Sequence, residues 1–252
     1  MSVGESVERS VLLLHAGIAD SRMWQPQIEV LRANGYRVLA PDLRGYGDRP
    51  FEGPTFSHLR DVEPLLDRPS AVVGCSLGGR VALELAVCHP DRVERLVLIA
   101  PGLPGWTWSP ETRAGWQAEE AAFEQGDLDG AAEASVRLWV DGPRRSPDEV
   151  DPGLRAAARA MILRSYELEA AGDDAREEDI PGGPVSERLH EVRCPTLVLV
   201  GEEDTADMQA VAAHVAASIA GAQLATIPGA AHLPSLECPD ETSTHLLAFL
   251  NG

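Results

Sequence analysis

The chain has 252 residues, of which 44% are hydrophobic and 24% are charged, and its formal net charge at pH 7 is −19. This composition is typical of a globular protein with one large core, and no apolar run approaches the roughly 20 residues that span a bilayer. The negative charge repels phosphate backbones and anionic membranes, so we expect neither nucleic-acid nor membrane partners. All 21 basic residues are arginines, which excludes a lysine nucleophile.

The N-terminal residues and the cysteines indicate a reducing compartment. Residues 1–10 lack the basic stretch followed by an apolar one that a secretory signal needs, so we expect a cytoplasmic location. The cysteines are scattered and form no C-x-x-C pair, which argues against a disulfide framework and a zinc site. We expect each to be a small buried hydrophobe. They are Cys75, Cys88, Cys194 and Cys238.

Short apolar runs rich in β-branched residues recur along the chain, and each ends at a glycine, aspartate or proline before a helix-like stretch begins. This alternation predicts an α/β fold, with a mostly parallel sheet and helices on both faces. The predicted strands are residues 11–14, 37–40, 71–73, 96–99, 196–200 and 224–227. The predicted helices are residues 23–33, 78–89, 207–220 and 239–250.

The alternation stops after the strand at 96–99. Residues 104–193 contain no clear strand and read as helices interrupted by glycine and proline, which predicts an insertion over the carboxyl edge of the sheet. We therefore expect a core domain of residues 1–103 and 194–252, with residues 104–193 forming a helical cap, or lid.

The strongest local motif is G-x-S-x-G around Ser76. An apolar strand runs into it and a helix follows directly, which is the context that a nucleophile elbow requires. Gly74 and Gly78 permit a sharp turn that exposes the serine hydroxyl, and the helix N-terminus favours developing negative charge. The alternative is an ordinary glycine-rich turn in which the serine only caps the helix.

A nucleophilic serine needs a base, and the base needs an orienting acid. Two later loops offer them, because Asp204 follows the strand at 196–200 and His232 follows the strand at 224–227. Both loops lie at carboxyl ends of parallel strands, on the same edge as Ser76. The chain order Ser, Asp, His is the one expected for a hydrolase built on such a sheet.

The acid is less sharply defined than the other two groups. Glu202, Glu203 and Asp207 lie close to Asp204 in the sequence, and any of them could face the histidine. We rank Asp204 first. For His232 alone, the competing interpretation is a loop histidine, since the chain has seven histidines.

Beyond this motif, the chain resembles the α/β-hydrolase fold family, and especially its serine esterase and enol-lactonase-like branch. The resemblance covers nearly the whole chain except the insertion. Its matching features are His15 and Gly17 after the first strand, Trp24 at the end of the same segment, and the stretches 41–47 and 230–236. The resemblance implies a cap over Ser76.

The resemblance also implies an oxyanion hole made of two backbone N–H groups, those of Leu77 and Gly17. Ile18 is the alternative donor and an expected substrate contact, whereas His15 is expected to be structural. Two features depart from the family. Only about ten residues precede the first strand, which predicts a sheet shortened at its N-terminal edge, and Ala16 stands where relatives have glycine.

These residues predict a serine hydrolase that cleaves a carboxylic ester or lactone through an acyl-enzyme, without metal or organic cofactor. Carbon–carbon bond hydrolysis, thioester cleavage, and acyl transfer or cyclisation in a biosynthetic pathway use the same groups and stay open. A ligand-binding protein that keeps the fold without turnover is the alternative from another class. We expect a monomer or homodimer whose partner is a small-molecule substrate.

Tryptophans in the predicted cap suggest the chemistry of that substrate. Because pockets are largely apolar, four tryptophans in one segment predict a hydrophobic or aromatic substrate. Trp106 and Trp108 are the expected pocket residues, since they follow the strand edge near Ser76. Trp116 and Trp139 are expected to pack the cap.

Overall fold

The structure is a computed structural model that describes residues 9–171 and 176–252. A six-stranded parallel sheet lies at its centre, with the strand order β2-β1-β4-β5-β7-β8. The strands are β1 (Ser10–Leu14), β2 (Arg37–Leu39), β4 (Ser70–Cys75), β5 (Val93–Ile99), β7 (Thr196–Gly201) and β8 (Gln223–Ile227). All six overlap predicted strands, and they are parallel to one another, as predicted.

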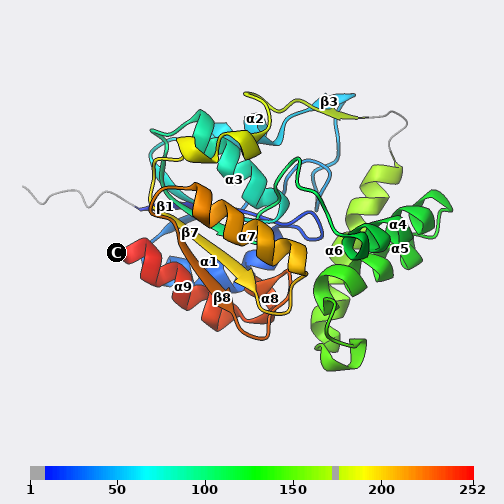
Figure 1. The fold of residues 1–252 in the computed structure, drawn as a ribbon. Helices are drawn as coiled ribbons and strands as arrows, with labels where there is room; N and C mark the ends of the chain where they lie inside the picture. Colours follow the sequence, from blue (N-terminus) through cyan, green and yellow to red (C-terminus); the bar gives the residue numbers. More distant parts are fainter. Residues whose placement is uncertain (1–8, 172–175) are drawn as a thin grey trace, which may run out of the picture.

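Helices cover both faces of the sheet (Figure 1). Helices α1 and α9 pack on one face, and α2, α3 and α7 pack on the other. Their bounds are α1 (Gln25–Ala33), α2 (His58–Val62), α3 (Leu77–Cys88), α7 (Ala206–Ser218) and α9 (Pro239–Asn251). No helix in the described ranges is both long and apolar enough to cross a membrane.

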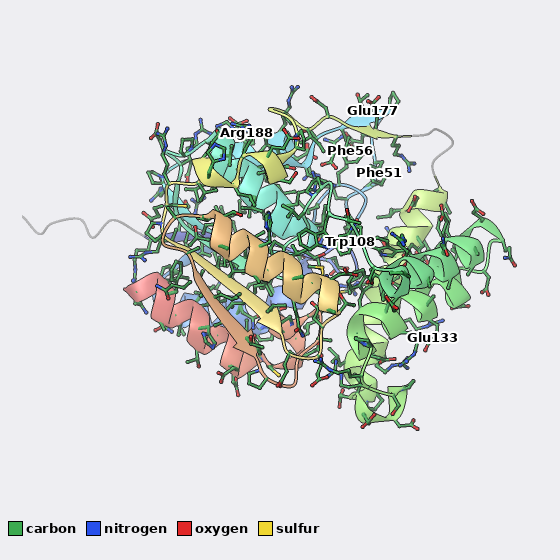
Figure 2. All side chains as sticks on the ribbon, viewed as in Figure 1. Phe51, Phe56, Trp108, Glu133, Glu177 and Arg188 are labelled. Atoms are coloured by element: carbon green, nitrogen blue, oxygen red, sulfur yellow. The ribbon has the colours of Figure 1, made fainter. Side chains whose placement is uncertain are left out.

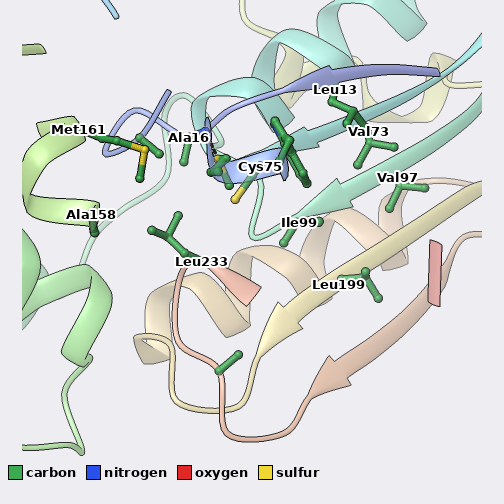
Figure 3. Packing of buried hydrophobic residues seen from close by; sticks show 14 of the residues in the cluster. Leu13, Ala16, Val73, Cys75, Val97, Ile99, Ala158, Met161, Leu199 and Leu233 are labelled. Carbon is green, nitrogen blue, oxygen red and sulfur yellow. Dashed lines mark hydrogen bonds between the residues drawn. The ribbon is translucent and has the colours of Figure 1, made fainter. Parts of the chain in front are cut away.

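Alternate residues of the inner strands enter different hydrophobic clusters, as the two-residue repeat of a strand requires. In β1, for example, Val11 and Leu13 face α1 and α9, whereas Leu12 and Leu14 face α2, α3 and α7. Both faces are buried, which explains why the strands read as continuous apolar runs. Figure 3 shows part of the first cluster, in which Leu13, Val73 and Val97 line up across neighbouring strands.

Within residues 104–193, the helices between 110 and 170 lie beyond the carboxyl ends of the strands (Figure 1), whereas residues 185–192 pack against α3 and α7. The helices beyond the strand ends are α4 (Pro110–Glu124), α5 (Leu128–Ser135), the π-helix η3 (Val136–Asp141) and α6 (Pro152–Ala170). The first hydrophobic cluster continues into this segment, where Ala158 and Met161 of α6 pack near Leu233 and Ala16 (Figure 3). The segment therefore shares its core with the sheet.

Two short strands depart from the sequence prediction. Strand β6 (Glu177–Glu178) lies inside 104–193, where we expected none, and pairs in parallel with β3 (Thr55–Phe56). Two residues are too few to produce an apolar alternation, so the sequence carries no signal for them. The remaining short elements are η1 (Ser21–Trp24), η2 (Glu63–Leu65), η4 (Pro147–Glu149), η5 (Val185–Glu187), η6 (Leu189–Glu191) and α8 (Pro234–Glu237).

The cysteines are less uniformly buried than expected. All four are free thiols, but only Cys75 is buried, and the other three, Cys88, Cys194 and Cys238, are partly exposed.

Candidate active site

Ser76 occupies the turn between β4 and α3. Its φ of 50° and ψ of −110° place a non-glycine residue in a region that costs of order 1–3 kcal/mol. Backbone hydrogen bonds hold it there, because Ser76 N donates to the Ile99 carbonyl at 2.9 Å and Gly102 N donates to the Ser76 carbonyl at 2.9 Å. The turn is therefore strained and fixed by its neighbours.

The glycines on either side of Ser76 are required by close backbone approach. A Cβ added to Gly74 would lie 2.2 Å from the Gly78 carbonyl oxygen. One added to Gly78 would lie 2.2 Å from the Leu14 carbonyl oxygen. Real Cβ atoms do not come so close to backbone, so the turn depends on glycine at both positions.

His232 and Asp204 meet at the carboxyl edge of the sheet. His232 Nδ1 donates to Asp204 Oδ2 at 2.8 Å, and the two side chains are only 2% and 1% exposed. Asp204 Oδ1 accepts from Thr205 N at 2.8 Å. Because a carboxylate only accepts, the neutral imidazole carries its proton on Nδ1, which leaves Nε2 as the basic nitrogen.

The other acids near Asp204 have different partners. Glu203 forms an ion pair with Arg144 at 2.8 Å, and Glu202 accepts from Gly229 N at 3.4 Å. Asp207 accepts from the Ser109 and Thr112 hydroxyls, at 2.6 and 2.5 Å. Although desolvation opposes the effect, these hydrogen bonds hold the pKa of Asp207 below its ordinary value. Of the four acids considered, Asp204 is the one that contacts His232.

The loop that carries His232, called the histidine loop below, packs against the end of β4 just before Ser76. Cys75 Sγ donates to the His232 carbonyl at 3.6 Å, and the Trp139 ring lies 4.5 Å from the imidazole, centroid to centroid. Within residues 9–171 and 176–252, Ser76 Oγ makes no hydrogen bond to His232. Such contacts are often long before substrate binds, and they tighten in the reacting complex.

The loop after β1 lies against the Ser76 turn. A Cβ on Gly17 would meet Leu77 Cβ at 3.6 Å, and neither Gly17 N nor Leu77 N donates a hydrogen bond to any other described residue. His15 fixes this loop, because its Nδ1 donates to the Ala16 carbonyl and its Nε2 accepts from Leu43 N, both at 2.8 Å. Burial lowers the pKa of His15, which keeps it neutral.

Comparison with known proteins identifies the family of this chain. The model of the alpha/beta hydrolase family matches residues 11–244. The chain belongs to the alpha/beta hydrolase family. It is 31% identical to the pimeloyl-[acyl-carrier protein] methyl ester esterase of Aromatoleum aromaticum, an alignment that covers 96% of this chain and 98% of that esterase. As a member of this family the protein is a hydrolase enzyme.

Solved structures of two alpha/beta hydrolases are also similar. The enol-lactonase of Burkholderia xenovorans LB400 has a TM-score of 0.76 and 25% identity, covering 97% of this chain and 92% of that one. A thermophilic esterase from Thermogutta terrifontis has a TM-score of 0.77 and 28% identity, covering 96% and 89%. The similarity confirms the predicted fold.

A cavity of about 350 Å³ opens above Ser76 in this hydrolase. Its walls include Trp108, Trp116 and Trp139, whose rings form a row: Trp108 and Trp116 are 4.9 Å apart, and Trp116 and Trp139 are 6.1 Å apart, centroid to centroid. Figure 2 shows Trp108 where the sheet edge meets helices α4 to α6. Ile18 packs against the same aromatic group.

The structure corrects the expected roles of the tryptophans. Trp106 does not line the cavity in the described structure, because its ring packs 5.7 Å from the His214 ring of α7. Trp116 and Trp139, which we expected to pack the cap, do pack in one hydrophobic cluster, and they also line the cavity beside Trp108. Distance along the chain from the strand edge was a poor guide here, since α4 and η3 fold back over Ser76.

Arg80 lines the same cavity and was missed by the sequence analysis. Its Nη1 donates to Glu84 at 2.7 Å and its Nη2 donates to both oxygens of Glu178 at 2.8 Å. The side chain is 9% exposed. Two carboxylates thus pair with this guanidinium, and none of the described residues that line the cavity presents an unpaired cation beside Ser76.

Proposed function

We propose that the protein is a serine hydrolase that cleaves an uncharged, hydrophobic carboxylic ester or lactone. His232 Nε2 takes the proton of Ser76 Oγ while this oxygen attacks the carbonyl carbon. The imidazolium then protonates the leaving alkoxide oxygen. Water, deprotonated by the same nitrogen, cleaves the acyl-enzyme and restores the serine.

The observation that carries this proposal is the Asp204–His232 pair, packed behind a strained serine turn. The 2.8 Å hydrogen bond orients the imidazole and favours the imidazolium that forms during attack. A purely structural histidine would not need a buried carboxylate and a neighbouring serine with φ of 50°.

The oxyanion has two candidate donors. The N–H groups of Gly17 and Leu77 come from neighbouring segments, and neither is used by another described residue. The Leu77 N–H lies in the first turn of α3, where backbone N–H groups have no partner within the helix. Each such donor contributes on the order of 10²- to 10³-fold to acyl transfer.

The cavity supports an uncharged, apolar substrate. Three indole rings and Leu103 form an apolar part of the cavity wall. Arg80 is paired with Glu84 and Glu178, so it offers no free positive charge to an anionic group of a substrate. All three rings belong to residues 104–193, so we propose this segment as the cap of a core made of residues 1–103 and 194–252. The similar proteins named above act on a methyl ester and on an enol-lactone.

A fluorophosphonate tests the proposal. The wild-type protein should form a covalent adduct on Ser76 at near-neutral pH, located by mass spectrometry of the labelled peptide, and Ser76→Ala should form none. Absence of an adduct on the folded wild type would contradict the catalytic assignment and favour a ligand-binding protein.

Activity on a matched panel of neutral esters, lactones and thioesters then separates the remaining chemistries. Ester or lactone turnover well above thioester turnover is expected. The cytoplasmic location, the monomeric or homodimeric state and the independence of a cofactor stay predictions.

A further inference from the structure

Residues 104–193 contact His232 as well as the cavity. The backbone N–H of His232 donates to the Trp139 carbonyl at 3.2 Å, and the Trp139 ring lies against the imidazole at an interplanar angle of 37°. Trp139 belongs to the π-helix η3, a geometry that is rare and often found at functional sites. One residue of this segment thus contacts both the backbone and the ring of His232.

Glu237 holds the loop on both sides of His232. Its Oε2 accepts from Ala231 N at 2.9 Å, and its Oε1 accepts from Leu233 N at 3.0 Å. These are the residues immediately before and after the histidine. The Glu237 side chain is 3% exposed, and a buried carboxylate is costly unless a cation and hydrogen-bond donors satisfy it.

Arg145, which lies just after η3, supplies that cation. Its Nη2 donates to Glu237 Oε2 at 2.7 Å, and its Nη1 donates to the Gly229 carbonyl at 2.9 Å. The same guanidinium reaches back to η3, where Nη2 donates to the Val140 carbonyl at 2.6 Å and Nε donates to the Asp141 carbonyl at 2.8 Å. Arg145 therefore joins the end of η3 to the histidine loop.

The η3 end is itself fixed within the segment. Asp141 is fully buried and accepts from Arg137 at 2.6 Å and from Arg155 of α6 at 2.8 Å. A shift of α6 relative to the sheet would consequently be transmitted through Asp141 and Arg145 to the loop that carries His232.

We propose that Trp139, Arg145 and Glu237 form a brace that positions His232, so that residues 104–193 support the base as well as cover the substrate. This inference rests on the proposed function, since it assumes that His232 is the base. All three are positioning residues that act through His232. A general base displaced by about 1 Å can lose on the order of 100-fold in rate, which makes such a brace consequential.

The clean tests are Glu237→Gln and Arg145→Met, because neither side chain lines the cavity above Ser76. The glutamine amide would turn an N–H group toward either Ala231 N or Leu233 N, and it would remove the charge that pairs with Arg145. For each variant we expect kcat on a neutral ester to fall about 10- to 100-fold while KM stays within about twofold. Arg145→Lys, which keeps the charge but cannot reach all the carbonyls, should fall between Arg145→Met and wild type.

Matched controls make the same chemical changes away from the loop. Glu241→Gln alters an exposed glutamate that pairs with His245, and Arg159→Met alters a surface arginine paired with Asp129. Both controls should retain wild-type kcat. Thermal melting of every variant shows whether a loss of kcat reflects unfolding, and rates are measured at least 10 °C below each midpoint.

The outcomes separate this inference from the proposed function. If wild-type Ser76 forms no fluorophosphonate adduct, the proposed function fails. If wild type is labelled and active, but folded Glu237→Gln and Arg145→Met match the controls in kcat, the brace is wrong while the proposed function stands. A rise in KM with unchanged kcat would also overturn it, because it would assign these residues to substrate binding.

Discussion

The Ser76 turn and the His232 loop meet above the same sheet edge, but they are held in different ways. The turn is fixed by backbone packing among Gly74, Gly78 and the end of β1. The loop is fixed by side chains, since Glu237 binds the amides beside His232 and Arg145 reaches it from 84 residues away. A local motif and a long-range side-chain network thus serve one site.

This contrast separates two kinds of sensitivity. A turn built from backbone contacts tolerates no added atom, because rigid groups surround it. A loop held by ion pairs and hydrogen bonds can keep its fold when one partner is lost, yet its side chain can move away from the reacting geometry. We expect mutations at the turn to lower stability first, and mutations around the loop to lower turnover first.

The largest expected effect concerns the acid of the loop. Asp204→Asn should lower kcat by about 10³-fold or more with little change in melting temperature, because the amide no longer favours the imidazolium or the correct tautomer. Glu203→Gln is the matched control, since Glu203 pairs with exposed Arg144. Steady-state kinetics on one ester decides the point. Wild-type activity in Asp204→Asn together with loss in Glu203→Gln would reverse the assignment of the acid.

Glycine substitutions compare the two regions directly. Gly78→Ala should destabilise the protein by at least about 3 kcal/mol, because its Cβ would meet the Leu14 carbonyl. Gly229→Ala, in the histidine loop, should cost only about 1 kcal/mol from its φ of 72°, since nothing lies within 4 Å of the new methyl group. Urea unfolding measures both. Equal losses would contradict the distinction between rigid turn and adaptable loop.

A buried histidine of α2, outside both the turn and the loop, should contribute to the acid sensitivity of folding. Burial lowers the pKa of His58 to about 3, and the residue packs against Phe56 and Tyr46 without a carboxylate partner for its buried Nδ1. The folded pKa lies below the unfolded value of about 6.5, so stability is complete above that value and falls as the pH drops toward 3. At pH 5 the loss is about 2 kcal/mol.

His58→Phe tests this origin. The variant should show a smaller decrease in unfolding free energy between pH 7 and pH 5 than wild type does, measured by urea titration at both pH values. An unchanged decrease would assign the acid sensitivity to other groups.

The smallest predicted effect separates the two tryptophans that we first expected in the pocket. Trp108→Ala should change the preference between a short and a bulky ester by about tenfold in relative kcat/KM, because Trp108 lines the cavity. Trp106→Ala should leave that preference unchanged and lower the melting temperature, because Trp106 packs on His214. The same shift of preference in both variants would contradict this placement.

Local features were largely predictable from the sequence. The strands read as apolar runs because both faces of the sheet are buried, and G-x-S-x-G marks a turn that only glycine permits. Asp204 and His232 could be nominated because parallel strands deliver their following loops to one edge. The hydrogen bond between the two residues, however, first becomes visible in the folded chain.

The residues that support the site could not be found in this way. Arg145 and Glu237 are 92 positions apart, and no local pattern marks either as a partner of the histidine loop. Trp116 and Trp139 look like ordinary helix residues until α4 and η3 fold over Ser76.

The row of indole rings above Ser76 ends on the imidazole of His232. Trp139 lies 4.5 Å from that ring and 6.1 Å from Trp116, which in turn lies 4.9 Å from Trp108. These rings therefore form a group of fluorophores whose surroundings change when a molecule enters the cavity. The intrinsic fluorescence of the unlabelled protein should accordingly report the arrival of a ligand, which makes a stopped-flow record of binding accessible without a chromogenic ester.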